Sequence, residues 1–227
     1  MGSIISIHQP NYLPWLGFFH KVKNSNVFVI LDAVQFNNES FTHRTRIKTP
    51  QDWMWLTIPV GEASHNKKIN EIQLPQEESW KKKHIMSLEM NYKKAPFYET
   101  YLELIEMYST QKMNLVDFNI DLIRYLLDCL DIHPDIYRQS ELNIDPELKK
   151  TDLLVSIVKA LGGTVYLSGT GAKNYMELNK FAKAGIEVRY QNFKHPVYPQ
   201  RFKEFIPNLS VVDLLFNVGE SGKNLIV

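Results

Sequence analysis

The sequence contains little cysteine, little net charge and no long apolar run. Cys129 is the one cysteine among 227 residues, so the chain cannot form an internal disulfide, which fits a reducing compartment. The formal net charge is +1, whereas nucleic-acid binders usually carry a clear basic excess, so we expect no nucleic-acid partner. No segment approaches the roughly 20 apolar residues of a membrane span, and no basic region followed by an apolar stretch opens the chain. These absences predict a cytoplasmic protein without stable membrane insertion.

Common cofactor signatures are also missing. The seven histidines form no close pair with metal-ligand spacing and thiol ligands are nearly absent, so we expect no metal, although His8, His43 and His195 could converge in space. The glycine loop that starts at Ser168-Gly169 is neither a Walker sequence nor a complete dinucleotide fingerprint. The residues therefore leave the cofactor unknown, and they leave the oligomeric state open.

Strands and helices alternate at both ends of the chain. Residues 3–7 and 27–31 are continuous apolar runs, typical of strands covered on both faces, and a short helix between them completes a βαβ unit. The predicted strands are 3–7, 27–31, 44–48, 53–60, 68–74, 164–167 and 186–190. The predicted helices are 15–23, 79–94, 98–110, 115–130, 151–161 and 173–183. We predict one α/β domain over residues 1–227, with a largely parallel central sheet, flanking helices and a strand-and-helix insertion at roughly 42–145.

Polar side chains follow four of these predicted strands. In chain order they are His8 and Gln9, Asp32 and Gln35, Ser168 followed by the glycine loop at Gly169, and Gln191 with His195 shortly after. Ligands of open parallel sheets bind beyond the carboxyl ends of the strands. One edge of the predicted sheet would therefore gather these candidates into a polar ligand site.

His8 is the best candidate for acid–base chemistry, because imidazole takes up and releases protons near neutral pH. A rigid loop follows it, walled by Tyr12 and Trp15 and stiffened by two prolines, which is unusual for a plain connection. The alternative is a histidine that only hydrogen-bonds this loop. Asp32 could orient His8, bind a sugar hydroxyl or bind an amine, and its alternative is a turn cap.

Two further clusters are candidates for substrate binding. Arg44, Arg46 and Lys48 alternate and so share one strand face, where arginine could hold a phosphate or carboxylate in a bidentate pair. The alternative is a solvated edge strand whose basic residues discourage aggregation. His195, a further candidate catalytic residue, and Tyr198, a candidate for substrate binding, belong to a proline-stiffened segment that mirrors the first block and favours a shared polar pocket. Two rigid loops with satisfied side chains are the alternative.

The residues discussed so far, with others along the chain, resemble the WbqC-like protein family. The matching segments are His8-Gln9-Pro10-x-Tyr12-x-Pro14-Trp15-x-Gly17-Phe18-Phe19, Leu31-Asp32-x-Val34-Gln35-Phe36, Arg44-x-Arg46-Ile47, Trp55-Leu56-Thr57-x-Pro59-Val60, Tyr166-Leu167-Ser168-Gly169, Tyr190-Gln191, His195-Pro196-x-Tyr198-x-Gln200 and Leu209-Ser210-x-x-Asp213-Leu214-Leu215. The main departure is Asn174-Tyr175-Met176-Glu177, where an Asp is expected soon after the Tyr, so an acidic role there stays open.

The family is associated with O-antigen and other surface-polysaccharide gene clusters. The resemblance therefore implies N-acylation or aminoacylation, including glycyl transfer, of a nucleotide-linked amino sugar. It does not identify catalytic residues, which rest on the reasoning above.

A second similarity concerns the beginning of the chain. A strand, a histidine-containing loop, a short helix and a second strand before Gln35 look like the start of pantothenate synthetase and other nucleotidyltransferase-like folds. Those enzymes activate a carboxylate with ATP and pass it to an amine. Their paired histidines around a glycine are absent here, since His8 and His20 lie too far apart.

The leading hypothesis is an enzyme, an N-acyl or aminoacyl transferase. His8 would deprotonate the attacking amine and Asp32 would orient it, while amides near Gly169 could stabilise an oxyanion. Arg44 and Arg46 would hold the diphosphate, with Tyr12 and Trp15 stacked on base or sugar. The acyl donor could be an acyl carrier protein, a coenzyme A thioester or an acid activated by ATP. An ATP-dependent amide ligase, and a non-catalytic sugar-binding or scaffold protein, are the alternatives.

Overall fold

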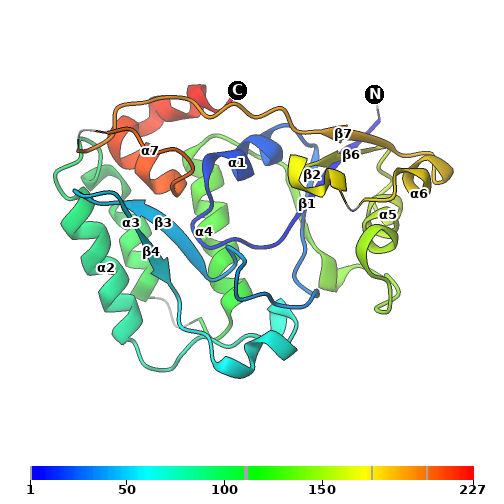
Figure 1. Ribbon diagram of the computed structural model, residues 1–227, viewed down its shortest axis with the longest axis horizontal. Coiled ribbons are helices and arrows are strands. Elements are labelled where there is room, and N and C mark those ends of the chain that lie inside the picture. The colour runs from blue at the N-terminus through cyan, green and yellow to red at the C-terminus, as the bar shows by residue number, and fades with distance from the viewer. Residues whose placement is uncertain (1, 110–111, 175, 203) are drawn as a thin grey trace. The chain divides into compact units, whose positions relative to one another are not determined.

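The computed structural model describes residues 2–109, 112–174, 176–202 and 204–227 (Figure 1). The chain divides into two compact units. Unit 1 comprises Met1–Gln9, His20–Ala33 and Ile132–Lys194, and unit 2 comprises Pro10–Phe19, Val34–Asp131 and His195–Val227. The chain passes between them within helix α1 (Leu16–Lys23). The prediction of a single domain with an insertion at residues 42–145 stays a prediction.

Unit 1 is built on a five-stranded sheet in which every pair is parallel, which confirms the α/β fold class (Figure 1). Its strands are β1 (Ile4–His8), β2 (Val27–Ile30), β5 (Asp135–Arg138), β6 (Val165–Ser168) and β7 (Glu187–Tyr190). The sheet order is β5-β2-β1-β6-β7. Strands β2 and β6 are buried along their whole length, as the continuous apolar run at residues 27–31 predicts for β2.

Helices α5 (Lys150–Ala160) and α6 (Leu178–Lys183) pack together in unit 1, and α6 packs on β7. Phe181 of α6 stacks on Tyr166 of β6 with ring centroids 5.2 Å apart. Gly163, just before β6, allows a close approach, because a Cβ there would come within 2.4 Å of Ile5. The short 3-10 helices of this unit are η5 (Gln139–Glu141) and η6 (Thr170–Asn174).

Unit 2 combines an antiparallel strand pair with helices. The strands are β3 (Arg44–Lys48) and β4 (Trp53–Thr57). The α-helices that belong wholly to this unit are α2 (Ser79–Tyr92), α3 (Leu102–Glu106), α4 (Leu115–Cys129) and α7 (Val211–Val218). Its 3-10 helices are η1 (Glu62–Asn66), η2 (Ile69–Glu71), η3 (Glu99–Tyr101), η4 (Met107–Ser109) and η7 (Gly219–Leu225). Asn114 caps α4, since its side chain accepts hydrogen bonds from two backbone amides of the first turn.

The strand predicted at residues 68–74 is wrong. This segment contains η2, and Ile69 and Ile72 are both buried although they lie three residues apart, a spacing that an alternating strand does not allow. The Glu71 carboxylate accepts a hydrogen bond from the Lys68 amide at 2.8 Å and closes the turn.

Two predicted helices are divided in the structure. The helix expected over 98–110 consists of η3, α3 and η4 as far as Ser109, and Thr110 lies outside the described residues. The helix expected over 173–183 is replaced by η6 and α6, and Tyr175 is likewise outside the described residues. Before α6, the Glu177 amide donates to the Thr151 hydroxyl at 3.2 Å, so a side chain on α5 accepts this hydrogen bond.

Strand β5 was not predicted, and it lies inside the segment interpreted as an insertion. Its residues alternate between exposed and half-buried, because β5 is an edge strand that pairs only with β2. A short edge strand has no continuous apolar run, so the pattern that identified the central strands is absent here.

Candidate functional site

The two strands β1 and β6 separate at the carboxyl edge of the parallel sheet. Strand β1 pairs with β2 as far as His8, which lies opposite Ile30, but its pairing with β6 ends at Ser6, opposite Leu167. From β1 the chain continues to β2 on one side, and β6 lies on the other side. This is the topological switch point of a doubly wound sheet, the position beyond whose carboxyl ends such sheets bind ligands.

The predicted site residues of unit 1 all follow the carboxyl ends of strands in this one sheet. They are His8 at the end of β1 and Gln9 after it, Asp32 after β2, Ser168 at the end of β6 and Gly169 after it, and Gln191 after β7. The structure thus brings them to one edge, as parallel pairing requires. Their roles in binding or catalysis stay predictions.

His8 is half-buried at the end of β1, and its ring nitrogen Nδ1 lies 3.0 Å from the carbonyl oxygen of Gln9. A carbonyl only accepts hydrogen bonds, so Nδ1 carries the proton and Nε2 carries the lone pair of the neutral ring. Burial, helped by the charge of Lys21 and opposed by the hydrogen bond to the Gln9 carbonyl, lowers the pKa of His8 to about 3. His8 is therefore neutral at physiological pH and acts as a hydrogen-bond acceptor at Nε2.

Lys21 is a group that the sequence interpretation missed. Its side chain is buried, and its Nζ donates to the carbonyl oxygen of Ile7 at 3.0 Å. Burial lowers the pKa of Lys21 to about 7. The available signal was a lysine within α1 between the apolar neighbours Phe19 and Val22, both of them fully buried.

Asp32 clamps the turn that follows β5. Its fully buried carboxylate accepts hydrogen bonds from Arg138 Nε at 3.1 Å, from the Ser140 amide at 2.9 Å and from the Ser140 hydroxyl at 2.7 Å. These contacts join the end of β2 to η5. They match the turn-cap alternative for Asp32, and its role as an orienter of His8 stays a prediction.

A backbone hydrogen bond connects the ends of β6 and β7, where Ser168, Gly169 and Gln191 lie. The backbone N–H of Gln191 donates to the Ser168 carbonyl at 2.8 Å. The side-chain amide nitrogen of Gln191 lies 2.9 Å from Nδ1 of His20 on α1. A Cβ added at Gly169 would meet nothing within 4 Å, so space is open beside this backbone. The following helix, η6, has only five residues, so its dipole adds little to anion binding by the loop.

Tyr12 belongs to the core of unit 2. It is fully buried, and its hydroxyl bonds to Nδ1 of His84 at 2.8 Å and to the hydroxyl of Tyr108. His84 Nε2 faces the Thr57 carbonyl at 3.1 Å, so Nε2 carries the proton and Tyr12 donates to Nδ1. The ring of Tyr12 packs against Phe118 and is fully buried, and its predicted stacking on a base or sugar stays a prediction.

Removing the Tyr12 hydroxyl is expected to destabilise the protein without changing its fold. In Tyr12→Phe, His84 Nδ1 and the Tyr108 hydroxyl lose their buried partner, which costs about 1–3 kcal/mol of the free energy of unfolding. Urea denaturation at pH 7 measures this cost. Tyr137→Phe, at a tyrosine that is 42% exposed on β5, is the control and should change stability by less than about 0.5 kcal/mol. Equal effects of the two substitutions would contradict the hydrogen-bond chain.

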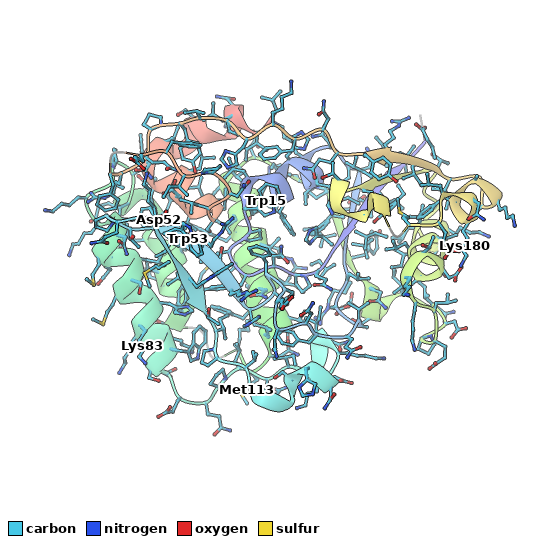
Figure 2. The ribbon with its side chains drawn as sticks, viewed as in Figure 1. Trp15, Asp52, Trp53, Lys83, Met113 and Lys180 are labelled. Carbon is cyan, nitrogen blue, oxygen red and sulfur yellow. The ribbon has the colours of Figure 1, made fainter. Side chains whose placement is uncertain are left out.

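Trp15 lies immediately before α1 and is half-buried (Figure 2). Its indole covers Gly17, where a Cβ would come within 2.3 Å of the ring, so the turn into α1 requires glycine. The backbone of Trp15 also forms an isolated antiparallel β-bridge with Ser210. Its predicted stacking on a ligand stays a prediction.

Arg44 and Arg46 form a ladder with the tryptophans of β4. The Arg44 guanidinium lies 4.6 Å from the ring centroid of Trp55, and Arg46 lies 5.1 Å from that of Trp53, which is labelled on β4 in Figure 2. The Nε groups of both arginines are buried without an acceptor among the described residues. Such cation–π pairs preorganise the guanidinium planes, while the predicted diphosphate contact stays a prediction.

Gln35 is exposed and donates to the His65 carbonyl at 3.0 Å.

Tyr198 is buried in a polar cluster around Asp213. Its hydroxyl donates to Asp213 Oδ2 at 2.9 Å, and the Tyr92 hydroxyl donates to Oδ1 at 2.9 Å. The Nζ of buried Lys48 donates to Gln200 at 3.0 Å and to the Glu204 carbonyl. The Tyr198 hydroxyl is engaged with this buried carboxylate, and the predicted role of Tyr198 in substrate binding stays a prediction.

Burial raises the pKa of Asp213 to about 6, while the two tyrosine hydroxyls and Lys48 oppose that shift. His195 is half-buried and precedes Tyr198 by three residues in the chain. Its Nδ1 donates to the Pro196 carbonyl at 2.8 Å, and its ring stacks near the ring of Tyr198. The sequence interpretation did not include Asp213 among site residues. Its signal was the single acid of α7, a helix whose other residues are apolar except Asn217.

Neither a membrane span nor a metal-ligand cluster is found where the structure describes the chain. None of those helices combines the length and hydrophobicity that crossing a membrane requires. Within the same residues, His, Cys, Asp and Glu side chains nowhere gather in a group of three or more that could hold a metal ion.

Comparison with known proteins identifies the family. A family model described as "WbqC-like protein family" matches residues 9–224. The chain is also 30% identical over 220 residues to "Uncharacterized protein Rv1507c" of Mycobacterium tuberculosis (strain ATCC 25618 / H37Rv), a match that covers 95% of this chain and 94% of that protein. No solved structure shows a significant match. The chain belongs to the WbqC-like protein family.

Proposed function

We propose that the protein is an N-acyl or aminoacyl transferase, including a glycyl transferase, that acts on a nucleotide-linked amino sugar in bacterial surface-polysaccharide biosynthesis. The observation that carries the proposal is a neutral histidine, His8, at the switch point of a doubly wound sheet. Nucleotides bind at this position in such sheets, and a neutral imidazole beside them can accept a proton from an attacking amine.

The chemistry follows from the groups at this edge. The amine nitrogen of the sugar attacks the acyl carbonyl carbon, and its proton passes to Nε2 of His8 as the C–N bond forms. The carbonyl oxygen becomes an oxyanion, for which the backbone amides near Gly169 are donors. When the C–S bond of a thioester donor breaks, His8 returns the proton to the leaving thiolate. The acyl donor would be an acyl thioester of an acyl carrier protein or of coenzyme A.

The sheet order favours a second candidate, an ATP-dependent amide ligase. Numbered along the sheet's own strands, β5-β2-β1-β6-β7 is the order 3-2-1-4-5 of doubly wound nucleotide-binding sheets. In this reaction a carboxylate oxygen attacks the α-phosphorus of ATP, pyrophosphate leaves, and the amine then attacks the acyl adenylate and releases AMP. The same His8 would accept the proton of the amine.

A donor-exchange assay tests both candidates. The purified protein is incubated with a UDP-linked amino sugar and one donor in each reaction. The three donors are acetyl coenzyme A, an acyl carrier protein thioester, and ATP with glycine. The products are identified by mass spectrometry. An amide formed from a thioester supports the transferase. An amide formed only with ATP, together with pyrophosphate, supports the ligase.

The UDP-sugar that carries a hydroxyl in place of the amine is the control, and it should give no product with any donor. Binding of the amino sugar without turnover under all three conditions would contradict both enzyme proposals. It would instead support a non-catalytic sugar-binding protein. A thermal shift with each nucleotide sugar reports binding independently, because a ligand of the native state raises its apparent stability.

A further inference from the structure

Lys21 is a buried cation to which the described part of the chain gives no acidic partner. Its side chain is only 4% exposed, and its Nζ donates a hydrogen bond to the Ile7 carbonyl at 3.0 Å. Along the described ranges no carboxylate lies within ion-pair distance of that Nζ. Lysine is rarely fully buried unless it is paired, because burial disfavours the charged ammonium. The structure therefore maintains a group that is costly to bury.

The position of this cation coincides with the ligand edge of the sheet. Lys21 and strand β1 belong to the same unit, and the Lys21 side chain reaches the carboxyl half of β1, where its Nζ donates to the Ile7 carbonyl. Its Nζ reaches Ile7, one residue beyond the last paired position between β1 and β6. Lys21 thus lies at the switch point itself.

The groups around Lys21 make this point basic. His8, the next residue on β1, is the titratable side chain whose pKa the Lys21 charge lowers. On α1, His20 is engaged with Gln191. On the neighbouring strand end, the Asp32 carboxylate is bound by Arg138 and Ser140. The charge of Lys21 therefore acts on the neighbouring His8 ring. The Asp32 carboxylate is occupied by Arg138 and Ser140 and does not pair with Lys21.

We propose that Lys21 binds an oxyanion of the ligand, a phosphate or a carboxylate, and that the protein takes up a proton when this oxyanion binds. The oxyanion supplies the missing counter-charge and stabilises the ammonium form of Lys21. It also offsets the positive charge that acts on His8, which makes His8 a stronger base when ligand is bound. This last step rests on the proposed function, whereas oxyanion binding and proton uptake do not.

The expected proton uptake follows from the titration of Lys21. With a pKa of about 7, free Lys21 is about half protonated at pH 7, and a bound oxyanion returns its pKa toward the ordinary value of 10.5. Binding is then expected to take up about half a proton at pH 7 and about nine-tenths of a proton at pH 8. An ordinary surface lysine, already protonated, would take up almost none.

Isothermal titration calorimetry in buffers of different ionisation enthalpy, such as PIPES and Tris, measures this uptake. The probes are pyrophosphate and UDP for the phosphate source, and acetate and glycine for the carboxylate source. Lys21→Met removes the charge at similar volume, and Lys23→Met, at the exposed lysine two residues on, is the matched control. We expect at least tenfold weaker binding and no proton uptake for Lys21→Met, and wild-type behaviour for Lys23→Met.

Thermal stability separates this role from a structural one. Lys21→Met should raise the melting temperature without ligand, because it removes a buried uncompensated cation, whereas a structural lysine would lower it on replacement. Failure of every probe to bind, binding without proton uptake, or unchanged binding by Lys21→Met would overturn the proposal. Oxyanion binding with proton uptake but no amide product under any condition would retain this proposal and reject the proposed function.

Discussion

The His8→Gln variant is expected to turn over the amino-sugar nucleotide about 10²–10⁴-fold more slowly than the wild-type protein. Glutamine can still hydrogen-bond within the loop, but it has no nitrogen that takes up a proton from the attacking amine. Measurement of kcat and KM with the active donor separates these functions. A lower kcat with unchanged KM assigns proton transfer to His8. A higher KM with unchanged kcat assigns ligand binding to His8.

The matched control is His133→Gln. This histidine is exposed, belongs to the same unit and precedes β5, so it lies at the amino edge of the parallel sheet, opposite the proposed site. Its replacement should leave turnover unchanged. Wild-type turnover in His8→Gln would remove His8 from the mechanism.

The pH profile gives an independent readout of the same group. Because the pKa of free His8 is lowered to about 3, its neutral form is already present throughout pH 5–8. The value of kcat/KM, which reports groups of the free protein, should therefore show no inflection from His8 near 6.5. An inflection there that disappears in His8→Gln would contradict the burial argument.

Replacing Asp213 by alanine is expected to cost about 3–5 kcal/mol of the free energy of unfolding at pH 7. The carboxylate accepts hydrogen bonds from Tyr92 and Tyr198, and its charge acts favourably on buried Lys48. Without it, two buried hydroxyls lose their acceptor and the Lys48 ammonium loses a stabilising charge. Asp213→Asn keeps one acceptor oxygen, so its cost should be smaller.

Urea denaturation measures this cost, provided that the slope of the unfolding free energy against urea concentration is the same in the variant and the wild-type protein. The control is Asp152→Ala, which removes an exposed ion pair with Lys180 and should change stability by no more than about 1 kcal/mol. In a double-mutant cycle, Lys48→Met should cost less in the Asp213→Ala background than alone, because the charge of Lys48 has already lost its partner. Additive effects would contradict electrostatic coupling between the two side chains.

The pH dependence of stability should change in the same variants. The folded-state pKa of Asp213 is raised from 3.8 to about 6, so the folded protein holds a proton between these values that the unfolded chain releases. Asp213 therefore contributes stability below about pH 4 that is lost as the pH rises through 6. Asp213→Asn should remove this component of the profile.

The fold class was predictable because the central strands are buried on both faces. Residues 3–7 and 27–31 read as continuous apolar runs, and the structure places β1 and β2 there in parallel pairing. Edge strand β5 and the 3-10 turn η2 were not predictable from the same pattern. Their side chains are half-exposed or spaced three apart, so neither periodicity nor hydrophobicity distinguishes them clearly.

The sequence by itself determined which polar residues lie at the ends of three strands of the parallel sheet, because such a sheet sends all its carboxyl ends to one edge. His8, Ser168 and Gln191 follow from that rule alone. The sequence did not determine which aromatic residues are exposed. Tyr12 is buried by partners 72 and 96 residues away, and such contacts depend on long-range packing.

Only the tertiary structure decided where the sheet divides and what lies there. Strand order depends on pairings between segments as distant as β1 and β6, which local patterns do not encode. The burial of Lys21 depends on the same packing, since a lysine on an isolated helix would stay in water. The sequence therefore specified the polar strand ends, and the packing of distant segments placed a buried cation among them.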